Sequence, residues 1–227
     1  MLNSDQHAPD GSGLSGGALT QFVFSNLHRT NPLLSVLDLS GTPLTFGEPD
    51  ASGSNWPMIV VPSLTNLALD RLPQLRTGPV GADLLWLSGM PALRLLSLSD
   101  LPNAAIDTAA FSNASANLFA VDLHATRLVG DLRPLYGLRQ LYSLAMDQSG
   151  LHSTLPTNVS AVWPELSILR ASHCRLFGPL PSFANLPALS DINFANNELS
   201  GTLPADLFDG SVQLFSLDLS FKSVRQQ

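Results

Sequence analysis

The stretch LSDINFANNELSGTLP, residues 189–204, decides the fold of this chain. It opens with apolar residues in the spacing LxxLxLxx, reaches an asparagine and ends in LxGxLP. An apolar residue at every second position of a short segment is typical of a β-strand with one buried face. The segment therefore predicts a strand whose Ile192 and Phe194 point into a core.

The first half of this pattern occurs eight times along the chain. Its first apolar positions are separated by 30, 29, 25, 23, 25, 23 and 25 residues, so the two N-terminal units carry insertions. Such a period indicates a solenoid, in which each repeat buries its apolar edge only against its neighbours. One parallel strand is expected per repeat, centred on Leu37, Leu67, Leu96, Val121, Leu144, Leu169, Ile192 and Leu217.

Five residues after each strand centre comes a position where a polar side chain can satisfy buried backbone groups of a turn. Asn, Cys, Thr and Ser can all donate to a buried carbonyl, whereas Leu72 and Leu101 cannot, and Lys222 is an unusual occupant. A structural ladder is therefore expected from Thr42, Thr126, Ser149, Cys174 and Asn197. Cys174 is the single cysteine, which excludes an internal disulfide and a cysteine-based zinc cluster.

The second half of the pattern recurs as LVGDL (128–132), LHSTLP (151–156), LFGPLP (176–181) and LSGTLP (199–204). Together with LxxLxLxx it resembles the plant-type subclass of leucine-rich repeats. That subclass is found in receptor-like kinase ectodomains, in inhibitors of secreted polygalacturonases and in surface antigens of kinetoplastid parasites. The resemblance implies an α/β-type right-handed solenoid. A short parallel β-sheet would form its concave face, with irregular, 3-10 and short helical segments on the convex face.

Three regions are expected on this basis. Residues 1–30 would form a partial upstream repeat or an atypical N-terminal cap with a Gly/Ser-rich segment, residues 31–221 the leucine-rich-repeat domain of about eight repeats, and residues 222–227 a polar tail. Family ectodomains usually begin with a signal peptide and a cysteine-bearing cap, and neither pattern is seen. Both ends are interpreted as cut through repeats, which predicts a fragment. The alternative is a short protein with atypical caps.

The composition argues against several functions. Eleven Lys and Arg against eighteen Asp and Glu give a net charge of −7 without any basic run, which disfavours nucleic acid as a partner. No apolar run approaches the roughly 18–20 residues needed to cross a bilayer. The localisation stays open, although the resemblance favours the cell exterior or surface.

No catalytic or metal site is expected. The stretch Gly11–Gly17 matches both GxGxxG and GxSxG, but the buried strand that either motif needs upstream is missing. His124 and His173 lie two repeats apart, roughly 10 Å, without an evident third metal ligand. No nucleophile and base pair, phosphate loop or metal cluster is found, so we expect neither enzyme activity nor a cofactor.

The expected binding surface is the outward face of the sheet, where acids outnumber arginines. A cluster that departs from the repeat consensus forms the candidate ligand site, with two further acids beside it: His124, Asp147, Arg170, His173, Asp122 and Asp191. The aspartate of LDL recurs in Asp38, Asp122 and Asp218, and it could instead be a habit of the fold. Asn113 and Asn158 head the sequons NAS and NVS, which makes them candidate N-glycosylation sites outside this face.

These features predict a non-catalytic module that binds a protein or peptide with basic or polar groups on its concave sheet. Self-association through exposed solenoid ends is also expected. The alternative is an ectodomain fragment of a membrane receptor-like protein kinase or of a cell-surface antigen.

Overall fold

The computed structural model describes residues 31–42, 61–77 and 84–220. The regions 1–30 and 222–227, with the Gly11–Gly17 stretch and Lys222, lie outside the described residues.

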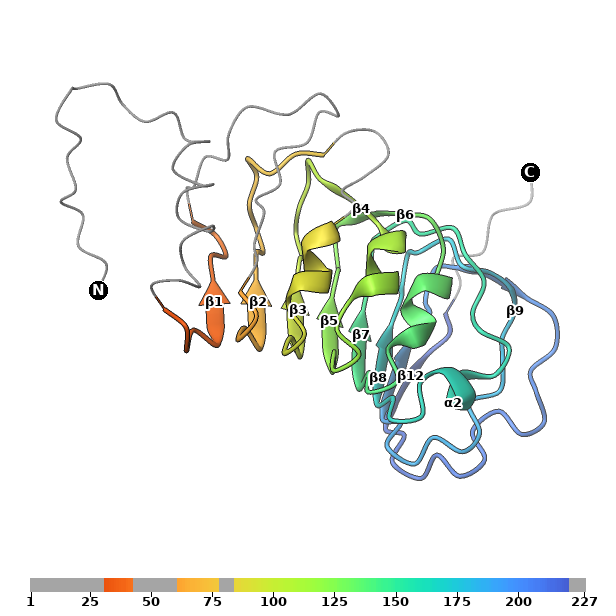
Figure 1. Ribbon diagram of the computed structural model, residues 1–227. Coiled ribbons are helices and arrows are strands. Elements are labelled where there is room, and N and C mark those ends of the chain that lie inside the picture. The colour runs from red at the N-terminus through yellow and green to blue at the C-terminus, as the bar shows by residue number, and fades with distance from the viewer. Residues whose placement is uncertain (1–30, 43–60, 78–83, 221–227) are drawn as a thin grey trace, which may run out of the picture.

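A parallel sheet runs through the described part of the chain, with one strand of three residues in each of eight repeats (Figure 1). The strands follow one another in chain order, and in each pairing the expected central residues lie opposite one another, as Leu37 does with Leu67. The expected parallel sheet is therefore confirmed. Its strands are β1 (Val36–Asp38), β2 (Asn66–Ala68), β3 (Leu95–Ser97), β5 (Ala120–Asp122), β7 (Ser143–Ala145), β8 (Ile168–Arg170), β10 (Asp191–Asn193) and β12 (Ser216–Asp218).

A continuous apolar core lies behind this sheet and joins residues from Val61 to Phe194. The central residues of β2 to β10 are almost fully buried, whereas Leu217 in β12 is 44% exposed. Removing this apolar surface from water is the main stabilising contribution, at about 25 cal/mol per Å². Each repeat covers its neighbour, so stability is expected to be close to a nearest-neighbour sum.

Short helical segments lie beside the sheet as a second layer (Figure 1): η1 (Leu85–Gly89), η2 (Thr108–Asn113), η3 (Arg133–Gly137) and α2 (Val159–Val162). Trp163, directly after α2, is fully buried. Its indole N–H donates to the carbonyl of Leu135 over 3.1 Å, and its ring meets Tyr136 edge-on. These contacts tie α2 to η3 of the preceding repeat.

Two small parallel sheets were not foreseen from the sequence. β4 (Ala105–Asp107) pairs with β6 (Arg127–Val129), and β9 (Phe177–Pro179) pairs with β11 (Glu198–Ser200). β6, β9 and β11 overlap the beginnings of LxGxLP segments, which we expected to be irregular. The pairing arises because stacked repeats bring equivalent extended segments side by side.

Asn197 satisfies four backbone groups at the turn after β10. Its Oδ1 accepts from the N–H groups of Cys174 (3.1 Å) and Leu176 (2.9 Å). Its Nδ2 donates to the carbonyls of Ala171 (2.7 Å) and Phe194 (3.0 Å). One buried amide therefore links the turns of two successive repeats.

The other expected ladder residues make similar bonds with hydroxyl and thiol groups. The Thr126 hydroxyl donates to the carbonyl of Leu98 (2.8 Å) and accepts from the N–H of Leu101 (3.1 Å). The Thr42 hydroxyl donates to the carbonyl of Leu39 over 2.7 Å. Each of these side chains replaces backbone partners that the turn lacks.

Cys174 is a buried donor within this series. Its thiol donates to the carbonyl of Met146 over 2.8 Å and lies 3.3 Å from the hydroxyl of Ser149. Burial raises the pKa of the Cys174 thiol to about 11. The sulfur is therefore protonated at neutral pH, which suits a hydrogen-bond donor and not a nucleophile.

Candidate functional site

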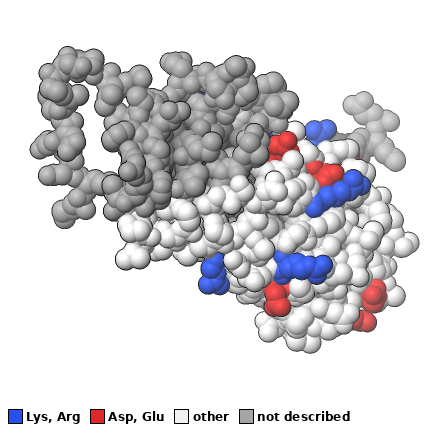
Figure 2. All heavy atoms as spheres, in the orientation of Figure 1, with Lys and Arg blue, Asp and Glu red and all other residues white. Residues whose placement is uncertain are grey.

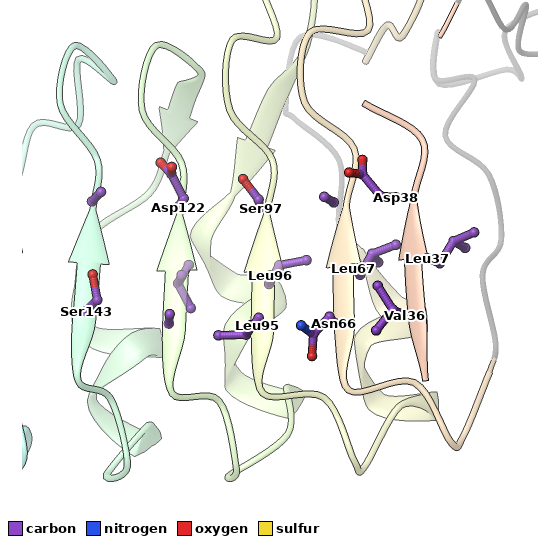
Figure 3. A pocket seen from close by; sticks show the side chains of 14 residues that line it. Val36, Leu37, Asp38, Asn66, Leu67, Leu95, Leu96, Ser97, Asp122 and Ser143 are labelled. Atoms are coloured by element: carbon purple, nitrogen blue, oxygen red, sulfur yellow. The ribbon is translucent and has the colours of Figure 1, made fainter. Parts of the chain in front are cut away.

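The concave face is built from the strand residues on either side of each buried centre. The residues that begin the strands form a first row: Val36, Asn66, Leu95, Ala120, Ser143, Ile168, Asp191 and Ser216. The residues that end the strands form a second row: Asp38, Ala68, Ser97, Asp122, Ala145, Arg170, Asn193 and Asp218. Parallel in-register pairing places each row in a line across the strands, as Figure 3 shows for β1 to β7.

A shallow groove of about 460 Å³ crosses this face from β1 to β7 (Figure 3). Two large apolar side chains of the first row are solvent-exposed there, Val36 at 56% and Leu95 at 38%. Asp38 and Asp122 lie at the other side of the groove, where the strands end. The large apolar side chains of the groove therefore lie on one side, beside Asn66 and Ser143, and its two carboxylates lie on the other.

The aspartates of the second row shape the turn that follows each strand. The Asp122 carboxylate accepts from the N–H of His124 over 3.0 Å, and Asp38 and Asp218 make the same bond to the residue two positions on. Asn193 accepts equally from the N–H of Ala195 over 3.0 Å. The aspartate of the recurring LDL therefore has a structural role in the turn, which is the alternative that the sequence left open.

Two other acids join neighbouring strands. The Asp70 carboxylate accepts from the hydroxyl of Ser97 and the N–H of Ser99, both over 2.7 Å. The Asp147 carboxylate accepts from the N–H (2.7 Å) and the hydroxyl (2.6 Å) of Ser172. Each of these two acids therefore ties the end of one strand to the turn that follows the next strand.

His124 lies between two carboxylates. Its Nδ1 is 2.8 Å from an oxygen of Asp122, and its Nε2 is 3.5 Å from an oxygen of Asp100. Burial alone would lower the pKa of His124, but the hydrogen bond to Asp122 and the charges of Asp122, Asp100 and Asp70 together raise it above its ordinary value. The ring is 40% exposed, so a partner could reach it.

Arg170 is held by Asp191, at the other end of the candidate cluster. The guanidinium donates through Nε (2.7 Å) and Nη2 (2.5 Å) to one carboxylate oxygen. We expected Asp191 to be accessible to a partner, but it is only 4% exposed. It neutralises Arg170, whose own side chain is 53% exposed. Asp191 therefore positions Arg170 and does not present a free charge.

The candidate cluster is spread across the sheet and not gathered into one network. His124 and Asp147 follow β5 and β7, Arg170 ends β8, and the exposed His173 has a positive φ of 53° in the next turn. Among the described residues, the hydrogen bonds of these side chains go to Asp122, Ser172 and Asp191 and not to one another.

An aromatic stack beside the first row was missed in the sequence. The rings of Phe119 and Tyr142 are parallel within 7°, with centroids 4.8 Å apart, and the guanidinium of Arg94 lies 5.8 Å from the Phe119 centroid. These residues directly precede first-row residues of β3, β5 and β7. Aligning the position before the strand across repeats would have revealed the signal.

The part of the chain that the structure describes contains no group of three His, Cys, Asp or Glu side chains able to hold a metal ion. None of its helices is long and apolar enough to span a membrane. The two sequon asparagines are exposed on the helical layer. Asn113 ends η2, and Asn158 caps α2 by accepting from the N–H of Ala161 over 3.0 Å.

No family model matches the sequence. Toll-like receptor 9 of the dog, Canis lupus familiaris, is 35% identical over 128 residues, which cover 53% of this chain and 12% of that receptor. The chain therefore spans about an eighth of this relative.

Three solved structures share the architecture. The ectodomain of the plant membrane receptor kinase GASSHO1/SCHENGEN3 from Arabidopsis thaliana, in complex with CASPARIAN STRIP INTEGRITY FACTOR 2, has a TM-score of 0.58 and 23% identity, covering 82% of this chain and 24% of that one. The Arabidopsis receptor kinase HAESA, in complex with the peptide hormone IDA and the co-receptor SERK1, has a TM-score of 0.58 and 20% identity, covering 92% and 40%. Internalin C2 of Listeria monocytogenes has a TM-score of 0.53 and 21% identity, covering 81% and 70%.

The sheet, its register and these likenesses define the class of protein. The chain folds as a right-handed leucine-rich-repeat solenoid with a concave parallel sheet. The fold expected from the repeat pattern is thus confirmed.

Proposed function

We propose that the chain is a non-catalytic module that binds a protein or peptide on its concave sheet. The observation that carries this proposal is the groove over β1 to β7, where Val36 and Leu95 are exposed and do not belong to the apolar core of the described residues. Exposed apolar side chains within a polar rim are typical of protein interaction sites.

The solved likenesses support a peptide or protein as the ligand class, because two of them are complexes of receptor kinases with CASPARIAN STRIP INTEGRITY FACTOR 2 and with IDA. Acidic side chains on the concave side favour a partner with basic or polar groups. Of the candidate residues, Asp122, His124, Asp147, Arg170 and His173 would contact the partner, and Asp191 would hold Arg170.

The longer receptors suggest a setting for such a module. The chain covers 24% and 40% of the two receptor kinase chains, so an ectodomain segment of a membrane receptor or surface antigen is consistent with it. In that setting Asn113 and Asn158 would carry glycans on the helical layer, where they leave the sheet open.

A peptide library displayed on phage and selected on the immobilised chain tests the site. We expect the selected peptides to lose at least tenfold in affinity, about 1.4 kcal/mol, for Leu95→Ser. Leu203→Ser is the matched control, since Leu203 is 65% exposed outside the groove. A concave site would be refuted if the peptides bound the Leu95→Ser variant with unchanged affinity and no longer bound the Leu203→Ser variant.

Arg170→Ala is a poor test of the same site. It would leave the buried Asp191 carboxylate without its cation, and an uncompensated buried charge destabilises the fold itself. Asp147→Asn is preferable, because an amide oxygen can still accept from Ser172 while the charge is removed.

A further inference from the structure

The two sides of the concave groove from β1 to β7 differ in chemistry. The apolar margin consists of Val36, Leu95, Phe119, Ala120 and Tyr142, at or just before the strand starts, and is interrupted by the polar Asn66 and Ser143 in the same row. The acidic margin consists of Asp38, Asp70, Asp100, Asp122 and Asp147, at or after the strand ends. Figure 3 shows Val36 and Leu95 at one level of the strands, with Asp38 and Asp122 at the other.

The carboxylates of the acidic margin have hydroxyl, backbone N–H and imidazole neighbours within the fold. Asp38, Asp70 and Asp147 accept hydrogen bonds from serine hydroxyls or backbone N–H groups, whereas Asp122 and Asp100 also lie beside the imidazole of His124. Two of its members remain well exposed, Asp100 at 47% and Asp122 at 39% of the side chain. Asp38 and Asp122 line the groove itself, and Asp70, Asp100 and Asp147 follow the strand ends beside it. The neighbouring basic groups are the Arg71 guanidinium near Asp38 and the His124 imidazole between Asp122 and Asp100.

The helical layer, which faces the viewer in Figure 1, has no such acidic margin among its described residues. Figure 2 shows this surface to be largely uncharged, with acidic and basic side chains next to one another.

The width and period of the groove fit a helix laid across the strands. The margins are two to five residues apart along the chain of a repeat, about 7 to 17 Å if extended, a range that includes the width of about 10 to 12 Å of a helix with its side chains. One helical turn rises about 5.4 Å, close to the strand spacing of about 4.8 Å. In an extended chain, residues on the same side are about 6.7 Å apart, which differs more from the strand spacing than the rise of a helical turn does.

We propose that the segment recognised in this groove is an amphipathic basic helix of a partner protein, lying across β1 to β7. Its apolar side contacts Val36, Leu95 and the Phe119–Tyr142 stack, and its Lys and Arg side chains face the acidic margin. This inference rests on the proposed binding function and specifies the chemistry of its partner.

Three synthetic 14-residue peptides with blocked ends separate the possibilities. The first carries Leu at helical spacing on one face and Lys on the other, the second has the same composition in strict Leu–Lys alternation, and the third replaces every Lys of the first by Glu. Binding to the full chain is measured by fluorescence anisotropy at low and moderate salt. We expect the first peptide to bind at least tenfold more tightly than the other two, with affinity falling as salt rises.

Single substitutions in each margin locate the peptide. Leu95→Ser and Asp122→Asn should each weaken the first peptide at least fivefold. Asp122→Asn preserves the turn, because Asn193 makes the equivalent bond in this chain. Leu203→Ser and Asp209→Asn change exposed residues away from the groove and should leave the affinity unchanged.

The outcomes separate this inference from the function on which it rests. If the alternating or the Glu peptide binds as tightly as the first and still responds to Leu95→Ser, the concave site stands and the basic helix is wrong. The basic helix is also wrong if the first peptide does not bind while library peptides respond to Leu95→Ser. If substitutions in both margins leave the affinity of every bound peptide unchanged and Leu203→Ser lowers it, the concave site itself is wrong.

Discussion

Asp122 has two roles that only its contacts separate. Its carboxylate closes the turn after β5 by accepting from the N–H of His124, and it also approaches the imidazole of that residue. Asn193 shows that an amide suffices for the turn, so the charge of Asp122 is not required by the backbone. The charge is therefore free to act on His124 and on a partner.

The titration of His124 should depend on Asp122. Because folding raises the pKa of His124, its contribution to stability is complete below the ordinary value, about 6.5, and is lost as the pH rises through the raised pKa. We expect Asp122→Asn to lower the midpoint of His124 in an NMR titration. An unchanged midpoint would show that this carboxylate does not set the titration.

Asn197 should be among the costliest single residues to replace. Asn197→Leu would leave two backbone N–H groups and two carbonyls without their partner, so we expect the free energy of unfolding to fall by about 3 to 5 kcal/mol. Asn158→Leu is the control, because its amide caps a short exposed helix and should cost only about 1 kcal/mol. Equal shifts of the urea midpoint for both variants would contradict the ladder.

The small β4–β6 and β9–β11 sheets join adjacent repeats. Gly130 directly follows β6 with a φ of +102°, and a Cβ placed there would collide with the Thr108 side chain at the start of η2. A glycine at this position therefore allows β6 to pack next to β4.

Gly130→Ala should destabilise the chain through both strain and collision. We expect a loss of about 2 to 3 kcal/mol in the free energy of unfolding. Gly150→Ala is the matched control: its φ is +67° and the space around its would-be Cβ is open, so strain alone should cost about 1 kcal/mol. Thermal or urea unfolding that finds the two variants equal would remove the argument for a close approach at Gly130.

The last strand of the described sheet, β12, differs from the inner ones. At β12, Phe215 is 82% exposed and Leu217 is 44% exposed, and Val212 just before the strand is 85% exposed. The residues equivalent to Leu217 in the inner strands, Leu67 to Ile192, belong to the buried core. Self-association of this chain through the β12 surface is therefore a prediction of the solenoid as a whole.

Phe215→Ser should reduce that self-association. In sedimentation velocity over a range of concentrations, we expect the chain to shift toward larger species and the variant to do so less. Leu203→Ser provides the control for general loss of apolar surface. A chain that stays monomeric at high concentration would argue against an interface at this end.

The repeat pattern was sufficient for the solenoid, because the buried and exposed faces of a short strand depend on strictly local alternation. Ile192 and Phe194 point inward in any chain that extends there with a core on one side. The ladder position of Asn197 could likewise be predicted, since its distance from the strand centre is constant in the repeat.

Only the stacking of repeats decided which outward side chains are free. Asp191 and Arg170 are 21 residues apart in the chain, and their ion pair exists because β8 and β10 are neighbours in register. The Phe119–Tyr142 stack and the β4–β6 pairing have the same origin. Such contacts between equivalent positions depend on the side chains that happen to meet across the interface, which the pattern of a single repeat does not contain. The sequence by itself therefore determined the solenoid and its strands, whereas the tertiary structure decided the charge and accessibility of its concave face.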